Sequence, residues 1–157
     1  RNMRKAWAEG YLTAITAMLA RVGIRVTLNA QTRARYFAEI NAPRFNTSFY
    51  LLGWTPSTGD AHNAFYNLAA TRGGARGVFN SAGYSNPAFD TLLDRIAVET
   101  DTAQRQRLIS DASRLLREDA AFIPLHQQQI VWAVRQGWTV VQTADNYFQL
   151  RHVRFGN

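Results

Sequence analysis

The chain contains no cysteine, which excludes disulfide bonds, thiolate metal sites and cysteine nucleophiles and fits the cytoplasm and the periplasm equally well. It also lacks any apolar run close to the ~18 residues that a membrane-spanning helix needs. Its first residues show neither an initiator methionine nor a signal-peptide pattern. We therefore expect a chain that is processed or cut from a longer protein.

Lysine is nearly absent, because 17 of the 18 basic residues are arginine. The formal net charge is +7, and residues 1–54 carry eight basic residues against Glu9 and Glu39. A basic segment of this kind can attract nucleic acid. The arginines are scattered, however, and no nucleic-acid-binding motif is present. Codon bias explains the arginine content more simply, and we expect no nucleic-acid partner.

Motifs for phosphate binding and hydrolysis are missing as well. The stretch 71–83 is rich in glycine and arginine, but it has neither the GxxxxGK[ST] nor the GxGxxG spacing. We interpret it as a mobile surface loop. A GxSxG nucleophile elbow is also absent. Asp90 and Asp94 are four residues apart without a second acidic helix or a histidine beside them, and are interpreted as solvated charges.

The three histidines, His62, His126 and His152, lie far apart in the sequence. None has a partner at metal-ligand spacing, so we predict neither a metal site nor a cofactor. With no catalytic set in view, we predict a binding or structural module and not an enzyme. Apolar residues make up 46% of the 157 residues, which is enough for one globular domain with a core.

The stretch 46–63 is the most informative part of the sequence. Residues 48–52 form an apolar run that is long enough for a buried strand and too short for a helix. Trp54 follows Gly53, and the next five residues are all typical of turns. Asp60, His62 and Asn63 then precede a helical pattern. Open α/β folds place ligand sites at such strand ends, although an ordinary turn with a core tryptophan explains the same pattern.

The N-terminal third alternates between helical and extended patterns. Apolar residues recur at three- and four-residue spacing over 3–22, which predicts an amphipathic helix capped by Gly23. Residues 24–28 alternate like a half-buried strand, and 32–43 predict a short helix. With the strand at 48–54, this β-α-β order predicts a right-handed crossover and parallel pairing.

Two further helices are predicted in the second half. Asn86 and Pro87 supply an N-cap and a first-turn proline. Asp101 or Thr102 caps the longest helix, and Gln104 is placed to complete a capping box with Asp101. The residues expected to face the core are Phe89, Leu92, Leu93, Ile96, Leu108, Ile109, Ala112, Leu115 and Leu116. Those expected on the solvated face of the longest helix are Arg105, Arg107, Asp111, Arg114 and Glu118.

Beyond residue 121 the sequence favours extended structure. Residues 122–125 begin an extended segment, and the composition predicts strands over 130–134, 139–141 and 147–155. Asp145–Asn146 is a turn signal between them. No internal repeat or low-complexity tract is present.

Four segments together resemble the C-terminal part of the family 5 extracellular solute-binding proteins, the peptide-, dipeptide-, nickel- and opine-type receptors of ABC importers. They are MLARVGIRV (18–26), SFYLLGWTPSTGDAHN (48–63), GYSNPAFDTLLD (83–94) and ETDTAQRQRLISDASRLLREDAAFIPLHQQ (99–128). Their order runs through nearly the whole chain. The Tyr-x-Asn-Pro-x-x-Asp piece from Tyr84 to Asp90 and the arginine-rich helix leading into Ile-Pro-Leu are specific in combination.

The resemblance implies an α/β fold, a type II periplasmic-binding-protein-like lobe with a mixed sheet flanked by helices. Residues 1–128 would be the second lobe of a two-lobe periplasmic receptor that delivers a peptide-like or other small solute to membrane permease subunits. Residues 129–157 would be crossover and C-terminal strands that normally pack on the first lobe. Strand edges left unpaired there predict a homodimer.

The resemblance also nominates ligand-binding residues. In peptide-binding members an aspartate three residues after the strand-end tryptophan holds the peptide's amino terminus, and here Ser57 follows Trp54 at that spacing. A neutral hydroxyl is a weaker acceptor for an ammonium group, and Asp60 is the acid that could substitute. The full set of expected ligand contacts is Trp54, Thr55, Ser57, Asp60, His62, Asn63, His126 and Gln128. His126 and Gln128 enter because the Ile-Pro-Leu segment ends at the cleft.

Rival functions remain open on the sequence. An enzyme of the same fold would need an acid–base or nucleophile pair in one loop, and none is found. A sensory or protein-docking module of the same fold would present its ligand to a membrane receptor.

Overall fold

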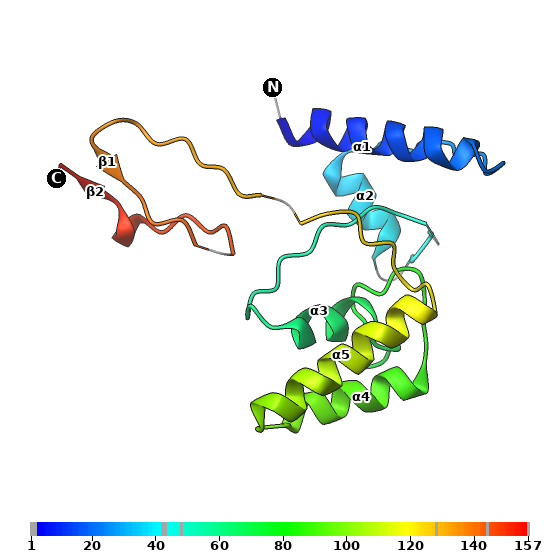
Figure 1. Ribbon diagram of the computed structural model, residues 1–157. Coiled ribbons are helices and arrows are strands. Elements are labelled where there is room, and N and C mark those ends of the chain that lie inside the picture. The colour runs from blue at the N-terminus through cyan, green and yellow to red at the C-terminus, as the bar shows by residue number, and fades with distance from the viewer. Residues whose placement is uncertain (1–2, 42–43, 48, 128, 144, 157) are drawn as a thin grey trace. The chain divides into compact units, whose positions relative to one another are not determined.

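The computed structural model describes residues 3–41, 44–47, 49–127, 129–143 and 145–156, with side chains described from residue 10 onward. The chain divides into two compact units, Arg1–Ala38 and Glu39–Asn157. Its elements in order are helices α1 (Met3–Ala20), α2 (Arg33–Ile40), α3 (Ala61–Leu68), α4 (Pro87–Val98) and α5 (Thr102–Glu118), strand β1 (Trp138–Thr139), the 3-10 helix η1 (Leu150–His152) and strand β2 (Arg154–Phe155) (Figure 1).

The end of α1 follows the sequence prediction. Gly23 has a φ of +81°, which a glycine adopts without strain. Its N–H donates to the carbonyl of Ala20 at 3.1 Å, and the N–H of Ile24 donates to the carbonyl of Leu19 at 3.0 Å. These two bonds form a Schellman motif, which satisfies carbonyls that the helix end would leave open.

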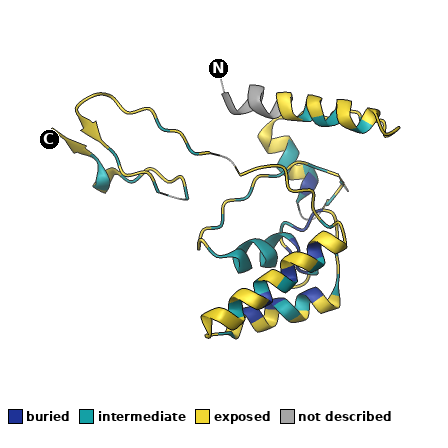
Figure 2. Ribbon diagram, in the orientation of Figure 1, coloured by how far each residue is buried: buried dark blue, intermediate teal, exposed yellow. Residues whose placement is uncertain are grey.

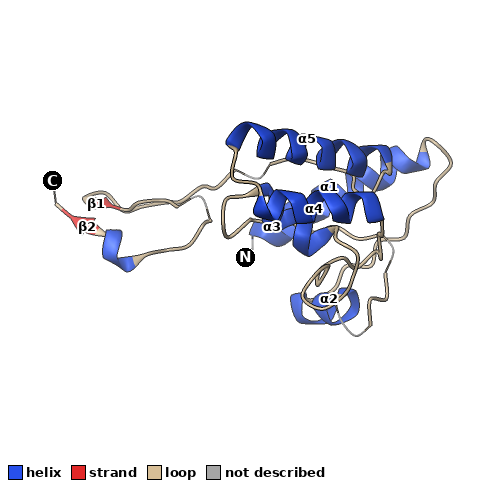
Figure 3. Ribbon diagram, turned by 90° about the horizontal axis from the view of Figure 1, so that it is seen from below, coloured by secondary structure: helices blue, strands red, loops and turns tan. Residues whose placement is uncertain are grey.

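The predicted parallel β-α-β unit is not formed. Residues 24–28 and 49–54 carry no strand, and within the described residues β1 and β2 are the only strands (Figure 3). The helix between these segments, α2, does form. A single extended segment leaves its backbone N–H and C=O groups unpaired unless a neighbouring strand bonds to them. The expectation of a mixed sheet is therefore not met in the described chain, although its helices are.

The C-terminal region forms a small hairpin with fewer strand residues than predicted. β1 pairs with β2 in antiparallel register, with Trp138 opposite Phe155 and their ring centroids 4.9 Å apart. The strand predicted at 130–134 is not formed, the one at 139–141 is represented only by β1, and the one at 147–155 is replaced by η1 followed by the short β2. The Asp145–Asn146 turn is confirmed, because the N–H of Asn146 donates to the carbonyl of Thr143 at 3.0 Å.

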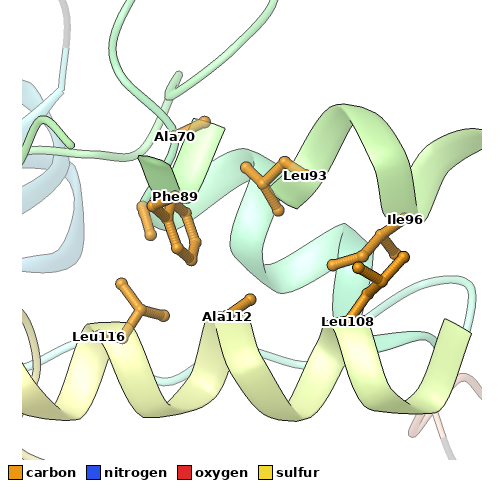
Figure 4. Packing of buried hydrophobic residues seen from close by; sticks show 8 residues of the cluster. Ala70, Phe89, Leu93, Ile96, Leu108, Ala112 and Leu116 are labelled. Atoms are coloured by element: carbon orange, nitrogen blue, oxygen red, sulfur yellow. The ribbon is translucent and has the colours of Figure 1, made fainter. Parts of the chain in front are cut away.

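The core of the second unit lies between α3, α4 and α5. Asn86 caps α4 by accepting from the N–H groups of Ala88 and Phe89, with Pro87 in the first turn. The buried stripe consists of Ala69, Ala70, Phe89, Leu93, Ile96, Leu108, Ala112 and Leu116 (Figures 2 and 4). Leu92, Ile109 and Leu115 pack beside it, half-buried. All nine residues predicted to face the core therefore belong to it.

The start of α5 is capped in a slightly different way from the prediction. Asp101 Oδ1 accepts from the N–H of Gln104 at 2.7 Å, as a capping box requires. The reciprocal bond comes from elsewhere, because the N–H of Asp101 donates to Oε1 of Glu99 at 2.9 Å. Glu99 precedes the helix, so its carboxylate reaches the cap from the linker between α4 and α5.

The glycine- and arginine-rich stretch 71–83, which the sequence predicts to be a mobile surface loop, is tied together by hydrogen bonds to one buried side chain. Asn80 is 1% exposed, and its side chain makes four hydrogen bonds to backbone groups. Its Nδ2 donates to the carbonyls of Ala70 and Tyr84 at 2.9 and 2.7 Å, and its Oδ1 accepts from the N–H groups of Gly83 and Tyr84 at 3.1 and 3.0 Å. A buried amide that is fully paired in this way holds its loop in one conformation.

Arg72, a residue of the same loop, bonds across it. Its Nε and Nη2 donate to the carbonyls of Asn80 and Ser81 at 2.7 and 2.8 Å. The guanidinium carbon lies 3.8 Å from the centroid of the Phe45 ring, a cation–π distance. The side chain therefore fixes loop 71–83 internally and joins it to the segment after α2.

No helix in the described ranges has both the length and the apolar character needed to cross a lipid bilayer.

Gly77 provides a test of this loop, because a Cβ there would lie 2.4 Å from the carbonyl oxygen of Ala70 at a φ of +61°. Gly74 has a similar φ of +58° with nothing within 4 Å. Both alanine variants carry the cost of a positive φ, about 1 kcal/mol. We expect Gly77→Ala to lower the free energy of unfolding by about 1 to 3 kcal/mol more than Gly74→Ala, because it also overpacks. Urea unfolding followed by circular dichroism measures the difference; equal midpoints would contradict the packing assigned to Gly77.

Candidate ligand-binding site

The turn before α3 positions the candidate site. Gly59 has a φ of +67°, and its N–H donates to the carbonyl of Pro56 at 3.2 Å. Asp60 then serves as the N-cap of α3, because its Oδ1 accepts from the N–H of His62 at 2.8 Å. The N–H of Asp60 in turn donates to Oγ1 of Thr58 at 3.3 Å. This confirms the predicted turn and gives Asp60 a capping role that an aspartate at this position fills well.

Trp54 is held against the start of α3. Its Nε1 donates to Oδ1 of Asn63 at 3.2 Å, and its ring centroid lies 5.3 Å from that of Phe79. An indole N–H can only donate, so the bond fixes which side of the Asn63 amide faces Trp54. The tryptophan is half-buried. Its hydrogen bond orients the Asn63 side chain on α3, and its ring contact with Phe79 links Trp54 to loop 71–83.

A cavity of about 240 Å³ opens at the N-terminal end of α3. Its lining residues are Thr58, Asp60, His62, Asn63, Tyr66 and Asn67. Asp60, His62 and Asn63 were expected at a ligand site, and the structure brings these three together. Thr58, Tyr66 and Asn67 were missed. Helical spacing could have identified two of them, because Tyr66 and Asn67 lie one turn after His62 and Asn63 on the same face of α3.

Contacts along α3 order this face of the cavity. The rings of His62 and Tyr66 have centroids 5.7 Å apart. Nδ2 of Asn67 donates to the carbonyl of Asn63 at 2.7 Å, which leaves the Asn67 side-chain oxygen as an acceptor. The cavity wall thus presents aromatic surface beside neutral amide groups, a combination typical of small-molecule sites.

Asp60 forms an ion pair with α5. Its Oδ2 lies 2.8 Å from Nη2 of Arg105, whose Nε donates to the carbonyl of Ile96 at 3.2 Å. The His62 backbone N–H is the main cause that holds the pKa of Asp60 below its usual value; burial opposes it, and the Arg105 guanidinium lowers the pKa further. Arg105 was expected on the solvated face of α5. Its side chain is instead partly buried, because it pairs with the Asp60 carboxylate and donates to the carbonyl of Ile96.

Among the other expected contacts in the described chain, Thr55, Ser57 and His126 do not line this cavity. Thr55 and Ser57 are exposed residues of the turn. His126 is exposed and does not line the cavity, and Gln128 lies outside the described residues. His152 is in η1, where it accepts from Nε of Arg151 at 3.1 Å. Across the described part of the chain, no three histidine, aspartate or glutamate side chains come together as a metal site would require.

The Tyr-x-Asn-Pro-x-x-Asp motif has a structural role in this molecule. Tyr84 Oη and Asn86 Nδ2 both donate to Oδ2 of Asp119, at 2.6 and 2.7 Å. Burial, followed by the Asp119 carboxylate, raises the pKa of Tyr84 to about 12. The two donors lower the pKa of Asp119. The motif therefore joins the start of α4 to the end of α5.

Asp90 and Asp94 were interpreted as solvated charges, which is wrong for Asp90. Its Oδ1 accepts from the N–H of Thr71 at 3.0 Å. Arg76 lies between both acids, with Nη2 at 3.8 Å from Asp90 Oδ1 and 3.2 Å from Asp94 Oδ1. Only Asp94 is largely exposed, at 68% of its side chain. Asp90 therefore holds the start of loop 71–83 to α4.

Comparison with known proteins finds relatives among the glutathione-binding proteins. The chain is 33% identical over 129 residues to the glutathione-binding protein GsiB of Pectobacterium atrosepticum, and 30% identical over the same length to the proteins of that name from Escherichia coli K12 and Shigella flexneri. Each alignment covers 80% of this chain and 25% of the relative. The chain thus spans about a quarter of the length of the curated relatives it matches.

No protein-family model matches the chain, and no solved structure matches it.

Asp60 can be tested through the two roles that its carboxylate fills. Asparagine caps a helix nearly as well as aspartate, so Asp60→Asn removes the ion pair with Arg105 and keeps the cap. Asp60→Ala removes both, and we expect it to be less stable than Asp60→Asn by about 1 kcal/mol. Chemical unfolding of the two variants and the wild type at pH 7 measures this order. Equal stability of the two variants would contradict the capping role.

The difference in unfolding free energy between the wild type and Asp60→Asn should depend on pH. The pKa of Asp60 is lower in the folded chain than the ordinary value of 3.8. The stability that its ionised form contributes is therefore fully present above pH 3.8 and is lost as the pH falls through the lowered folded pKa. We expect the difference in unfolding free energy between the two proteins to shrink across that acidic range. A difference that stays constant down to about pH 2 would show that the carboxylate charge does not contribute.

Proposed function

Because this chain belongs to the family 5 extracellular solute-binding proteins, we propose that it forms part of the solute-binding component of an ABC importer. The proposal is supported by the identity to the glutathione-binding proteins over 80% of the chain. We infer a periplasmic receptor that captures a small solute and delivers it to permease subunits in the membrane. The solute class we propose is a short peptide-like compound such as glutathione, the compound in the names of those relatives.

The observation that carries the proposal is the cavity beside the Trp54 turn, where polar side chains stand on a largely apolar wall. Its lining residues come from one loop and one face of α3, so ligand contacts would be made by an already ordered surface. The Asn63 amide nitrogen is available as a donor because its oxygen accepts the Trp54 indole N–H. We assign His62, Asn63, Tyr66 and Asn67 to hydrogen bonding and stacking with the solute.

The remaining residues of the expected site stay proposals. Trp54 would act as a rigid apolar wall beside the solute as well as orienting Asn63. Thr55 and Ser57 are at the exposed edge of the same turn, where a ligand that extends beyond the cavity would meet them. His126 and Gln128 would contact the solute only from the segment that follows Leu125. No catalytic role is proposed for any of these residues.

We propose a two-lobe mechanism in which residues 1–128 belong to one lobe of a type II periplasmic binding fold. Hinge closure against the other lobe would desolvate the solute and signal the bound state to the permease. The cavity described above would supply one wall of that cleft. With one wall alone the solute keeps much of its contact with water, so we expect this chain to bind more weakly than micromolar.

Binding can be tested by NMR titration of the ¹⁵N-labelled chain with glutathione. We expect the Asn63 and Asn67 side-chain amides and the Trp54 indole N–H to shift together, with a single dissociation constant above about 1 μM. Trp54→Ala should weaken binding about tenfold, because it removes both the wall and the bond that orients Asn63. Trp138→Ala is the matched control, since Trp138 lies in the β1–β2 hairpin, and should leave the dissociation constant unchanged.

Two outcomes would contradict this assignment. Shifts confined to residues outside the cavity would move the site elsewhere in the chain. An affinity of micromolar or better would contradict the one-wall account, because it would mean that the site is complete without a second lobe.

We further propose that residues 129–157 pair with a second copy of the chain when no first lobe covers them. The support is their exposed apolar surface: Val131, Tyr147, Phe148, Leu150 and Phe155 are each more than half exposed. Exposed apolar residues in this segment, of which Phe155 lies on β2, favour association. We expect light scattering to show a dimer for the chain and a monomer for a version ending at residue 128. A monomeric full chain at 100 μM, roughly, would overturn this proposal.

A further inference from the structure

Asp60 is the only carboxylate that lines the cavity in the described chain. The others among the lining residues are neutral side chains and one histidine. The charge that the cavity presents to a ligand therefore depends on whether the Asp60 oxygens are available.

Both Asp60 oxygens are already in use. Oδ1 accepts from the His62 backbone N–H at 2.8 Å, and Oδ2 pairs with Arg105 Nη2 at 2.8 Å. A ligand ammonium group needs a charge-assisted acceptor to be held in a desolvated site. Each oxygen keeps a further lone pair, but the Arg105 guanidinium, a permanent cation, already compensates the carboxylate charge and repels a second cation beside it.

Arg105 is held in place by more than its acid partner. Its Nε donates to the carbonyl of Ile96 at 3.2 Å, so the side chain spans from α5 to the end of α4 while it contacts the cap of α3. The Arg105 side chain is 28% exposed. An exposed ion pair contributes little because both partners are free to move, but here the second bond and the partial burial fix the guanidinium opposite Asp60.

We propose that Arg105 determines the charge selectivity of the cavity by pairing with Asp60, so that an ammonium group of a solute gains no advantage there over a neutral group. This inference rests on the proposed ligand role of the cavity. The groups left to the ligand are neutral: the Asn63 amide nitrogen, the Asn67 oxygen and the hydroxyls of Thr58 and Tyr66. They match the amide and carboxylate groups of a peptide-like solute and leave its amino group to be bound elsewhere.

The test compares triglycine with N-acetyltriglycine, which differ in the charge of one terminus and share the same carboxylate. NMR titrations at about pH 6.5, where an α-amino group is ionised, follow the Asn63 side-chain amide. The wild type should bind the two peptides within about twofold of each other. Arg105→Gln frees Oδ2 of Asp60 and should tighten triglycine binding about tenfold, with no gain for N-acetyltriglycine.

Two variants serve as controls. Arg107→Gln removes a positive charge from an exposed position of the same helix and should change neither affinity. The double variant Arg105→Gln, Asp60→Asn should lose the gain, because no carboxylate remains to receive the ammonium group. Circular dichroism checks that each variant is folded, and Arg105→Met replaces Arg105→Gln should the latter unfold.

The outcomes separate this inference from the proposed function. A wild type that already prefers triglycine tenfold, or an Arg105 variant that gains nothing for triglycine, overturns the selectivity role. If neither peptide nor glutathione binds the wild type, the proposed function fails, while a gain for triglycine in Arg105→Gln would still support the role of Arg105. A gain that persists in the double variant would also overturn the role, because it would not come from Asp60.

Discussion

The side-chain amide of Asn80 is the contact on which the second unit depends. It lies inside loop 71–83 and pairs with backbone groups of Ala70, Gly83 and Tyr84. Those residues connect the end of α3 with the approach to α4, so one buried group sets how two helices meet. Because the carbonyl of Ala70 is buried together with the amide, losing the amide would leave that carbonyl buried without this partner. Arg72 adds hydrogen bonds to the carbonyls of Asn80 and Ser81, and Gly77 lets the loop pass close to the carbonyl of Ala70.

The candidate site depends on this core indirectly. Trp54 contacts Phe79 within loop 71–83 and bonds to Asn63 on α3, so the wall of the cavity is braced by the same loop. Asp60 and Arg105 add a second link, from the cap of α3 to α5. The face that lines the cavity is therefore placed by three helices and one loop, and not by the sheet that the sequence suggested. The cavity face is thus organised by contacts between helices and a loop, and it does not need the edge of a sheet.

Helices were predictable from the sequence because their determinants are local. Asn86–Pro87, Asp101 and Gly23 mark helix ends through bonds to residues a few positions away, and the apolar spacing of α4 and α5 identified their buried faces. Strands were not, because the segments at 24–28 and 49–54 need hydrogen bonds from a neighbouring strand that pattern alone does not supply. Within the site, Asp60, His62 and Asn63 were identified by their place after the turn. The partnership of Asp60 with Arg105 was not, since it joins residues 45 positions apart whose meeting depends on helix packing.

The link through Asp119 has a consequence for how the sequence can vary. α4 and α5 are joined at one end by the short linker that contains Glu99, and at the other by Tyr84 and Asn86, which share a single oxygen of Asp119. Replacing Asp119 removes the acceptor of two donors at once, whereas replacing either donor leaves the other bond intact. Among descendants of a common ancestor, the acid should therefore be the slowest of the three positions to change. Where it does change, both donors are released from constraint together, so that substitutions at 84 and 86 should follow it and not precede it.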